Sequence, residues 1–548
     1  MLQLSEKTLA RLCLEASHQY GEHTAFAMFQ DDKINDDRQV SYKMLGFRSR
    51  QIALLLRQLG IKPGDRVLLL SENCPEWPLA YFGITLAGAV SVPLLTGFSA
   101  EQVQFITEHA GVSAIITSRT MAAKLEQVNP LLPLIFLDSM VKSENFEKIA
   151  VAVEGSEKRL SLPASNEELP QSKPEDLATI IYTSGTSGNS KGVMLSNLNI
   201  ISCVESSQYV AKFSPSDRFL SVLPMAHSYE CSIGLLYPIM CGASITYLDR
   251  PPSPSVLLPA AKLVHPTAML TVPLFIEKVY RNGIAPKLRQ SALYRFPLTR
   301  KLVIRIAGRK LNKTLGGKMQ FFGVGAAPLA TEVEQFLRDA RFPFAMGYGL
   351  TEAAPLLAGG TPFTYPFRST GALLPTVELR IAESETDANS ADAGVGEIQA
   401  RGPNVMMGYY RNEEQTREAF TADGWLRTGD LGRIDKNKKL FICGRSKFLI
   451  LGAGGENIYP EEIEGLLGSS PLVEDALVYS KKAGEITAMV KLTDAAKAAA
   501  DNLEQTLEEL RNWANKKLAD FSRISKIIIR EEPFEKTPTM KIKRHLYT

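Results

Sequence analysis

Cysteine and histidine are scarce in this chain of 548 residues, and neither is clustered. The six cysteines form no Cys-x-x-Cys pair, and the six histidines stand apart from one another. The sequence therefore predicts no structural zinc site, because such sites need closely spaced ligand pairs. Scattered cysteines are typical of reduced thiols, so we expect a cytoplasmic protein.

An excess of charge of one sign is also missing. The formal net charge is +3, with 22% charged and 45% hydrophobic residues. Proteins that bind nucleic acid in bulk usually have a much stronger basic bias, so we expect no nucleic-acid partner. The composition is typical of a globular protein, and the length suffices for more than one domain.

The sequence lacks an uninterrupted transmembrane run. Two uncharged stretches, Trp77 to Ala100 and Cys231 to Leu248, are long enough to raise the question. Each contains proline, and each places a glycine where a helix would end and a buried strand would begin, as does a weaker copy at His109 to Ile116. We therefore predict a soluble α/β core. Four charged residues near the start argue against a signal peptide: Glu6, Lys7, Arg11 and Glu15.

Alternating helix and strand patterns cover most of the chain. The first 60 residues predict a helix, a short hairpin around Asp36-Asp37 and a helix from Tyr42 to Leu59. A strand, Arg66 to Leu70, begins an alternation that continues to about residue 137 and favours a parallel sheet. Between about residues 370 and 440, short strands predict a small β-barrel or meander, and a compact α+β unit follows.

The most informative stretch is Thr179 to Gly192. Its β-branched start predicts a buried strand, and the loop that follows holds three glycines, five hydroxyl side chains and Lys191. Such a loop can direct backbone N–H groups, hydroxyls and a positive charge at a phosphate. It is not a Walker A loop, because Gly192 stands where that motif has Ser or Thr. The plainer alternative is a flexible surface turn.

Further candidate segments follow in order along the chain. His227 precedes an apolar stretch, where a lone histidine is often structural. Two small-residue segments, Gly323 to Pro328 and Gly347 to Glu352, allow a ligand to lie against the backbone, although Gly/Ala turns are common. Asp430 lies on a tight turn and has the alternative of an Asx-turn. The basic end, with Lys541, has the alternative of a solvated tail.

Together these segments resemble the AMP-forming adenylating enzymes, the superfamily of acyl-CoA synthetases, peptide-synthetase adenylation domains and luciferases. The resemblance covers essentially the full length in six motifs, and the Thr-Pro-Thr-Met-Lys ending is similar to that of long-chain acyl-CoA synthetases. It implies ATP, Mg²⁺ and coenzyme A as small-molecule ligands. The implied catalytic residues are Lys541, Glu352, His227 and Thr183, with Glu352 and Thr183 at the metal. The implied nucleotide- and CoA-binding residues are Thr183, Ser184, Gly185, Thr186, Ser187, Gly188, Lys191, Gly325, Ala326, Ala327, Gly347, Tyr348, Gly349, Thr351, Asp430, Arg445, Gly454, Gly455 and Lys541.

The resemblance also implies two domains. A large N-terminal domain, 1–444, would contain α/β halves at about 1–170 and 171–369 and the β-barrel part at about 370–440. A small, mobile C-terminal α+β domain, 445–548, would turn about a hinge near Lys447. The chain departs from the family pattern at Ser190, where proline is usual, and at Phe448, where an acid is usual.

The function that the resemblance implies is activation of a medium- or long-chain fatty acid to acyl-adenylate and transfer to coenzyme A. Three alternatives stay open: delivery to an acyl carrier protein, a non-catalytic acyl- or nucleotide-binding protein, and a structural or interaction protein. No carrier domain follows Thr548, which argues against the first. The intact glycine loop, Glu352 and Lys541 argue against the others.

A basic stretch at 281–318 is independent of the resemblance. From Arg281 to Thr331 there is no Asp or Glu, and apolar residues are interleaved with the cations. Such a pattern is typical of a helix that lies weakly on an anionic membrane. The alternatives are a solvated basic face balanced by acids elsewhere in the fold, or contact with the nucleotide end of coenzyme A.

Overall fold

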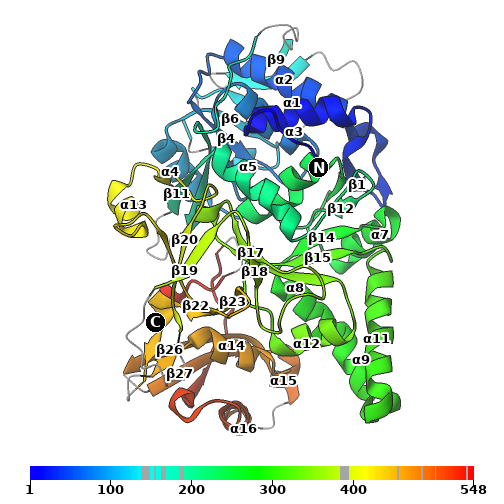
Figure 1. The fold of residues 1–548 in the computed structure, drawn as a ribbon, viewed down its shortest axis with the longest axis vertical. Helices are drawn as coiled ribbons and strands as arrows, with labels where there is room; N and C mark the ends of the chain where they lie inside the picture. The colour runs from blue at the N-terminus through cyan, green and yellow to red at the C-terminus, as the bar shows by residue number, and fades with distance from the viewer. Residues whose placement is uncertain are drawn as a thin grey trace.

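The computed structural model describes residues 1–126, 128–129, 131–137, 148–153, 156–161, 168–184, 190–382, 394–452, 456–482, 485–499, 502–537 and 541–548. Two large sheets with helices on their faces form most of the molecule, and a smaller unit follows at the C-terminal end (Figure 1). The α/β class and the division into a large and a small domain are as predicted. Among the described residues, no helix is long and apolar enough to cross a membrane.

The first sheet has nine strands, and its centre is parallel. Their order is β21 (Gly408–Tyr409), β11 (Ser190–Ser196), β10 (Leu177–Ser184), β5 (Val90–Leu94), β4 (Arg66–Leu70), β6 (Val112–Thr117), β7 (Leu134–Phe136), β8 (Lys148–Val153) and β9 (Ser156–Ser161).

The second sheet has fourteen strands and changes from parallel to antiparallel at β16. Its parallel part is β16 (Phe344–Gly349), β15 (Phe321–Val324), β14 (Ala268–Thr271), β12 (Arg218–Leu220), β13 (Ser244–Leu248) and β1 (Thr24–Gln30), edged by β2 (Lys33–Ile34) and β3 (Val40–Ser41). Its antiparallel part, where the sequence predicts a barrel or meander, is β17 (Leu356–Gly359), β18 (Gly371–Leu373), β23 (Lys439–Arg445), β22 (Leu426–Ile434), β20 (Gly396–Arg401) and β19 (Glu378–Ile381).

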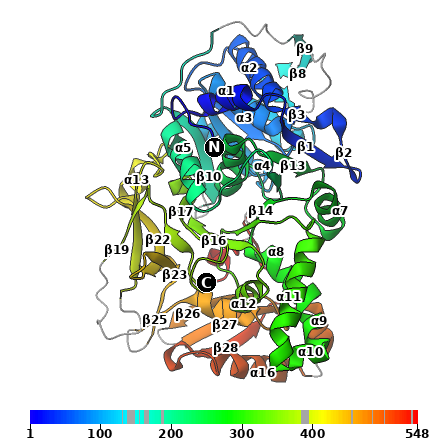
Figure 2. The ribbon, with the colours of Figure 1, turned by 45° about the vertical axis from the view of Figure 1, so that its right-hand side comes forward.

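The helices form three layers around the two sheets (Figure 2). Between the sheets lie α1 (Leu9–Tyr20), α2 (Tyr42–Gln58), α3 (Glu76–Leu86), α5 (Asn197–Ser206) and α6 (Tyr237–Cys241), which follows a π-helical turn, Glu230–Leu236. The outer face of the first sheet packs on α4 (Ala100–Ala110). The outer face of the second packs on α7 (Pro254–Val264), α8 (Pro273–Lys278), α11 (Pro297–Thr314) and α12 (Thr331–Asp339), near α9 (Ala285–Gln290) and α10 (Ala292–Arg295).

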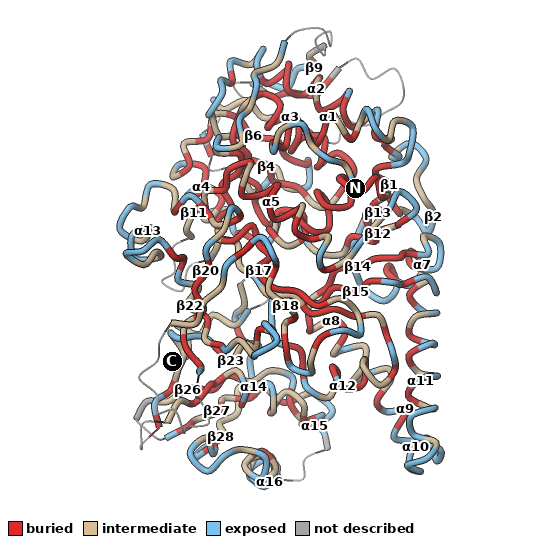
Figure 3. Tube along the Cα trace, viewed as in Figure 1, coloured by how far each residue is buried: buried red, intermediate tan, exposed pale blue. Residues whose placement is uncertain are grey.

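Side-chain alternation along the strands explains this layering. In β4, Val67 and Leu69 pack into the core between the sheets, whereas Leu68 and Leu70 pack into the outer core with α4. Both faces of such a strand are apolar because both are covered by helices. The buried residues consequently form continuous layers in the upper half of Figure 3.

The C-terminal unit has its own core. It contains β24 (Ile450–Leu451), β25 (Asn457–Ile458), the three-stranded sheet of β26 (Val473–Lys482), β27 (Glu485–Leu492) and β28 (Ile524–Ile529), and the helices α14 (Pro460–Gly468), α15 (Asp494–Ala499) and α16 (Leu503–Asn515). Its buried residues form one cluster, which includes Ile463, Val490 and Leu510. The remaining helix, α13 (Glu413–Ala419), precedes β22 in the N-terminal domain.

Several sequence predictions are confirmed at residue level. Helix α2 begins at Tyr42 and strand β4 spans Arg66–Leu70. Gly88, Gly111 and Gly242 have φ of 74°, 62° and 77°, as expected for glycines that end a helix before a buried strand.

Two predictions are corrected. The hairpin turn lies at Asp31-Asp32, both with positive φ, and not at Asp36-Asp37, which belong to a 3₁₀ turn before β3. A type I′ two-residue hairpin loop requires positive φ at both positions, which aspartate tolerates. The predicted halves 1–170 and 171–369 also do not match sheet membership. Strand β1 pairs with β13 in the second sheet, and the hairpin β10–β11 completes the first sheet beside β5.

Candidate active site

The hairpin of β10 and β11 carries the residues predicted to hold phosphate. Its register places Thr183 opposite Lys191, and the backbone of Ser184 opposite that of Ser190. The next element after Lys191 is a strand and not a helix, in agreement with the interpretation that this is no Walker loop. Gly185, Thr186, Ser187 and Gly188 lie outside the described residues.

Glu352 lies across from this hairpin, in a 3₁₀ turn (Thr351–Ala353) that follows β16. The Tyr409 hydroxyl donates a hydrogen bond of 2.9 Å to its Oε1 atom. The Lys191 ammonium lies 5.0 Å from the centre of the Tyr409 ring. Tyr409 therefore connects the phosphate hairpin with Glu352. Sequence reasoning missed this tyrosine, because its strand β21 is two residues long and belongs to no motif that we identified.

The first small-residue segment lies against an aromatic ring. A Cβ atom added at Gly323 would come within 2.9 Å of the Tyr229 hydroxyl, and one added at Gly325 within 3.1 Å of the ring. The following Ala326 has φ of 71°, and both it and Ala327 are exposed beyond the end of β15. Tyr229 thus packs against Gly323 and Gly325, and the exposed backbone begins after them, at Ala326 and Ala327.

The second small-residue segment forms the end of β16. Gly349 must be glycine, because an added Cβ would lie 1.9 Å from the Pro355 carbonyl oxygen. Gly347 and Tyr348 precede it in the strand, and Thr351 Oγ1 lies 3.2 Å from Ser228 Oγ. Because β15 and β16 are adjacent parallel strands, both small-residue segments lie at the same edge of the second sheet.

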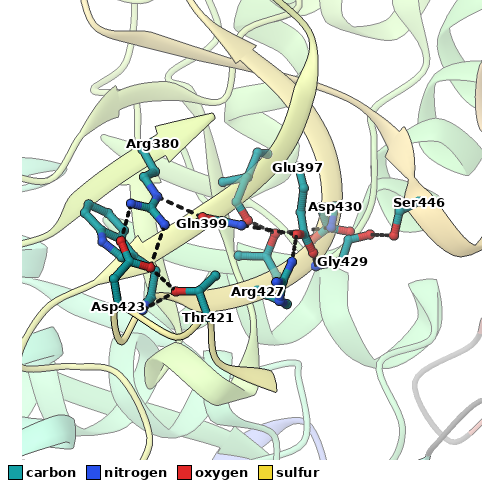
Figure 4. A network of polar contacts seen from close by, with 12 residues as sticks. Arg380, Glu397, Gln399, Thr421, Asp423, Arg427, Gly429, Asp430 and Ser446 are labelled. Carbon is teal, nitrogen blue, oxygen red and sulfur yellow. Dashed lines mark hydrogen bonds and ion pairs between the residues drawn. The ribbon is translucent and has the colours of Figure 1, made fainter. Parts of the chain in front are cut away.

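Asp430 is a buried carboxylate with two partners. The Tyr348 hydroxyl donates to Oδ2 at 2.8 Å, and Arg445 Nε lies 3.0 Å from Oδ1. The turn before it is held by Thr428, which donates to the carbonyl of Ile398. Figure 4 shows Asp430 near one end of a chain of polar contacts in the antiparallel strands, beside Gly429 and Ser446. The contacts with Tyr348 and Arg445 hold the Asp430 carboxylate in place. An isolated Asx-turn, the alternative explanation for this residue, would not require them.

The C-terminal segment brings Lys541 into the same region. Residues 536 and 542 form a β-bridge, and the Lys541 N–H donates to Thr537 Oγ1 at 3.2 Å. Lys541 is exposed overall, although nearby protein atoms partly desolvate its ammonium group. Burial lowers the Lys541 pKa, and Arg445 lowers it further, while Asp430 and Glu352 oppose the change. Lys541 is therefore close enough to Asp430 and Glu352 for their charges to affect its pKa.

His227 is close enough to Lys541 for the lysine charge to act on it. Burial, and then the charge of Lys541, lower the His227 pKa to about 4, so the imidazole is neutral at pH 7. Its Nδ1 atom accepts a hydrogen bond of 3.2 Å from the Tyr229 N–H, which places the ring proton on Nε2. His227 thus presents a neutral donor in this region.

The acidic side chains of this site are better suited to Mg²⁺, which protein and substrate bind together, than to a metal bound by protein side chains alone. The described residues contain no group of three or more His, Cys, Asp or Glu side chains placed to bind one ion. Mg²⁺ characteristically keeps several waters and binds through one or two carboxylates plus substrate phosphates. Glu352, with one oxygen held by Tyr409 and the phosphate hairpin opposite, matches that arrangement. Thr183, the other predicted metal residue, lies at the end of β10.

An apolar cavity of about 30 Å³ lies beside the small-residue segments. Gly323 and Gly347 form one wall. The remaining lining is almost entirely apolar or aromatic: Ser207, Val210, Ala211, Phe213, Tyr229, Ile233, Tyr237, Leu270, Phe321, Ala345, Met346 and Leu356. The sequence alone did not indicate these residues, because they come from separate helices and strands.

Lys447 occupies a 3₁₀ turn, Ser446–Phe448, between the last strand of the second sheet and the C-terminal unit. Phe448, which departs from the family pattern, lies under Arg544, whose guanidinium is 4.6 Å from the ring centre. Gly454 and Gly455 lie outside the described residues.

The fold and this arrangement of groups define an AMP-forming adenylating enzyme with two domains. The chain belongs to the AMP-binding enzyme family: the family profile matches residues 14–410, and that of the AMP-binding enzyme C-terminal domain matches residues 448–548.

Curated relatives match over most of their length. The chain is 30% identical to the human long-chain-fatty-acid–CoA ligase 1, covering 92% of this chain and 80% of the relative. It is 29% identical to the fatty acyl-CoA synthetase A of Dictyostelium discoideum (94% and 85%) and 28% identical to the long-chain-fatty-acid–CoA ligase FadD15 of Mycobacterium bovis (90% and 88%).

Solved structures share the fold over nearly the whole chain. An ATP-bound RpMatB-BxBclM chimera superposes with a TM-score of 0.77 at 25% identity, covering 98% of both chains. The O-succinylbenzoate CoA synthetase of Bacillus subtilis in complex with AMP has a TM-score of 0.74 at 23% identity, covering 98% of this chain and 97% of the other. The latter match supports the fold alone.

Proposed function

We propose that this protein activates a fatty acid with ATP and transfers the acyl group to coenzyme A, releasing AMP and pyrophosphate. The observation that carries the proposal is the apolar cavity beside Gly323 and Gly347. An apolar chain fits its lining, whereas a dicarboxylic acid would need a basic partner there. The names of the relatives, fatty acyl-CoA synthetase A and long-chain-fatty-acid–CoA ligase 1, support the same substrate class.

In the first half-reaction, an oxygen of the fatty carboxylate attacks the α-phosphorus of ATP, and pyrophosphate leaves as the bond to the α–β bridging oxygen breaks. Two groups of like charge must meet, so the site has to neutralise charge as it develops. Lys541 is the proposed group for this task, because it approaches Glu352 and Asp430 from the C-terminal unit. Neutral His227 would donate from Nε2 near the carboxylate.

The remaining residues would bind and orient ATP. Asp430, held by Tyr348 and Arg445, would accept hydrogen bonds from the ribose hydroxyls. The hairpin of Thr183 and Lys191 would hold the β- and γ-phosphates. Glu352 and Thr183 would hold Mg²⁺, which supplies neutralisation of phosphate charge.

The second half-reaction requires a different arrangement of the C-terminal unit. We propose that domain 445–548 turns against domain 1–444 about Lys447, which withdraws Lys541. The segment with Gly454 and Gly455 would then line the path of the CoA thiol. The thiol attacks the acyl carbonyl of the adenylate, and AMP leaves.

The length of the acyl chain that the site accepts depends on how far the cavity can widen. A volume of about 30 Å³ holds little more than water, so an acyl chain must displace side chains such as Phe213, which is only partly buried. Pyrophosphate release should be measured for acids from acetate to stearate, with and without coenzyme A. We expect a maximum at medium or long chains and full turnover only with coenzyme A.

The cavity variants Val210→Ala and Phe213→Ala should move the maximum towards longer acids. A Leu263→Ala variant, in an exposed position of α7, serves as the matched control. Activity confined to aromatic or dicarboxylic acids would contradict the fatty-acid proposal. Turnover that needs an acyl carrier protein in place of coenzyme A would select the second candidate acceptor.

A further inference from the structure

Helices α9 to α11 form an arm that extends from the outer face of the second sheet down the lower right-hand side of the molecule (Figures 1 and 2). Helix α11 packs on the protein through one face only, with Ile304, Gly308 and Leu311 buried. Gly308 lies so close to α12 that an added Cβ would come within 2.6 Å of the Ala340 carbonyl oxygen. This contact fixes which face of α11 points outward.

Large apolar side chains lie on the outward face. Leu298, Leu302 and Ile306 are spaced four residues apart and are 96%, 57% and 53% exposed. At the adjoining turn with α10, Leu293 and Phe296 are 58% and 63% exposed. Single exposed apolar residues are normal, but five within fourteen positions on one helical hairpin are typical of an interaction surface.

Positive charge surrounds this apolar stripe without acidic partners. Arg281 lies between Glu277 and Glu332, at 3.6 and 3.8 Å. None of the ten cations that follow forms an ion pair with a described residue: Lys287, Arg289, Arg295, Arg300, Lys301, Arg305, Arg309, Lys310, Lys313 and Lys318. Direct ion pairs with described acids therefore do not neutralise these ten cations, although the charge of Arg289 also acts on Glu332.

We propose that this arm, residues 285–313, docks the protein on an anionic lipid membrane. Arg305, Arg309 and Lys313 lie within the same helical face as the apolar stripe, so both groups meet a flat surface together. Exposed leucine and phenylalanine side chains can enter the headgroup region while the cations bind lipid phosphates.

A membrane explains the exposed apolar side chains and the cations of the arm together, which the other anionic partners do not. Coenzyme A and an acidic carrier protein would each account for the cations, but neither accounts for Leu298, whose side chain projects almost fully into solvent. Binding itself does not depend on the proposed function. Only its purpose, collecting a poorly soluble acyl substrate from a lipid surface, rests on the fatty-acid proposal.

Co-sedimentation of the full chain with vesicles tests the proposal. The vesicles contain phosphatidylcholine alone or with one third phosphatidylserine. Each cation near an anionic surface strengthens binding roughly fivefold, so changing Arg300, Lys301, Arg305 and Arg309 to Gln should weaken binding at least a hundredfold. A second variant, Leu298→Ser with Leu302→Ser, should weaken it at least tenfold without a change of charge.

A matched control removes four cations elsewhere, with Lys62, Lys212, Lys436 and Lys526 changed to Gln; all four are exposed. It should bind vesicles nearly as well as the parent, and all variants should keep ATP–pyrophosphate exchange with octanoate. Binding of the parent should fall when salt is raised from 0.1 to 1 M, because the screening length falls from about 10 to about 3 Å.

Four results would overturn the proposal. They are no vesicle binding, equal binding to neutral vesicles, equal losses in the control and arm variants, and binding that salt does not weaken. If vesicle binding is absent and the charge variant instead raises the KM for coenzyme A, the cations serve coenzyme A. If only acyl transfer to a carrier protein suffers, they serve that protein.

Discussion

Arg544 ties the segment that carries Lys541 to helix α14 through Glu464. Its Nη2 atom donates to both carboxylate oxygens of Glu464, at 2.6 and 2.5 Å, and Nη1 donates to the Val478 carbonyl at 3.1 Å. The two side chains are 13% and 17% exposed, so the pair is largely shielded from solvent. The position of Lys541 thus depends on a contact three residues further along the chain.

Arg544→Gln should weaken adenylation by displacing Lys541. We expect the transition state of adenylation to lose about 1.5–3 kcal/mol of stabilisation. This is the usual range for a hydrogen bond to a charged group. Rates of ATP–pyrophosphate exchange for Arg544→Gln, Glu464→Gln and the double variant measure the coupling. Because the two residues act through one contact, their effects should not add; additive effects would contradict a shared positioning role.

Lys541→Ala should impair the first half-reaction selectively. Loss of one preorganised donor at a developing charge costs about 2.7–4 kcal/mol in the transition state. Preformed acyl-adenylate with coenzyme A should still react at nearly the parental rate. Lys543→Ala is the matched control, because Lys543 lies on the same segment and pairs with Glu535 at 3.4 Å. Equal losses in both half-reactions would show that Lys541 has another role.

Glu352→Gln should raise the Mg²⁺ concentration needed for half-maximal activity, because Mg²⁺ favours a hard, charged oxygen. Asp at this position should be tolerated poorly but better than Gln. The Gln side chain can still accept from Tyr409, so the melting temperature should stay near that of the parent. A parental Mg²⁺ dependence in the variant would assign the carboxylate a structural role.

The Tyr409→Phe variant separates orientation from charge. It removes the hydrogen bond to Glu352 and keeps the ring beneath Lys191. We therefore expect the Mg²⁺ concentration needed for half-maximal activity to rise less than in Glu352→Gln, with little change in the melting temperature.

His227 should make the free energy of unfolding depend on pH between about 4 and 6.5. Its folded pKa is lowered to about 4 from the ordinary 6.5, so the unfolded chain binds the proton more tightly in this range. Stability should therefore rise with pH across this window, by at most about 1.4 kcal/mol per pH unit from this group, and level off above it.

Denaturant unfolding of the parent and of His227→Gln at several pH values isolates this contribution. The difference between the two curves should change between pH 4 and 6.5 and be constant from pH 7 to 8. A constant difference throughout would contradict a partly buried, neutral imidazole.

Local signals in the sequence predicted most of the fold. The glycines at 88, 111 and 242 marked helix ends because left-handed backbone is easily adopted only without a side chain. Ser196 caps α5, since its side chain accepts from the Asn199 N–H, and serine is a preferred residue at this position. The sequence did not predict which distant strands pair with each other. Nothing local in residues 24–30 indicates that β1 joins β13, more than 200 residues away.

The candidate site was predictable to the same extent. Asp430 and Glu352 stand in recognisable motifs, and the structure holds each with a tyrosine, Tyr348 and Tyr409. Tyr348 was within a motif, whereas Tyr409 acts from a short strand that only the folded sheet brings to Glu352. The apolar cavity likewise draws on helices and strands spread from Ser207 to Leu356, which no local pattern connects.

The most direct test of the account is a single-turnover experiment with ATP, Mg²⁺ and the best acid of the chain-length series, in which all products are identified by mass. Without coenzyme A, we predict about one equivalent each of pyrophosphate and enzyme-bound acyl-adenylate. Adding coenzyme A should convert that adenylate to acyl-CoA and AMP. Formation of ADP and phosphate, or an adenylate that coenzyme A does not consume, would contradict the account.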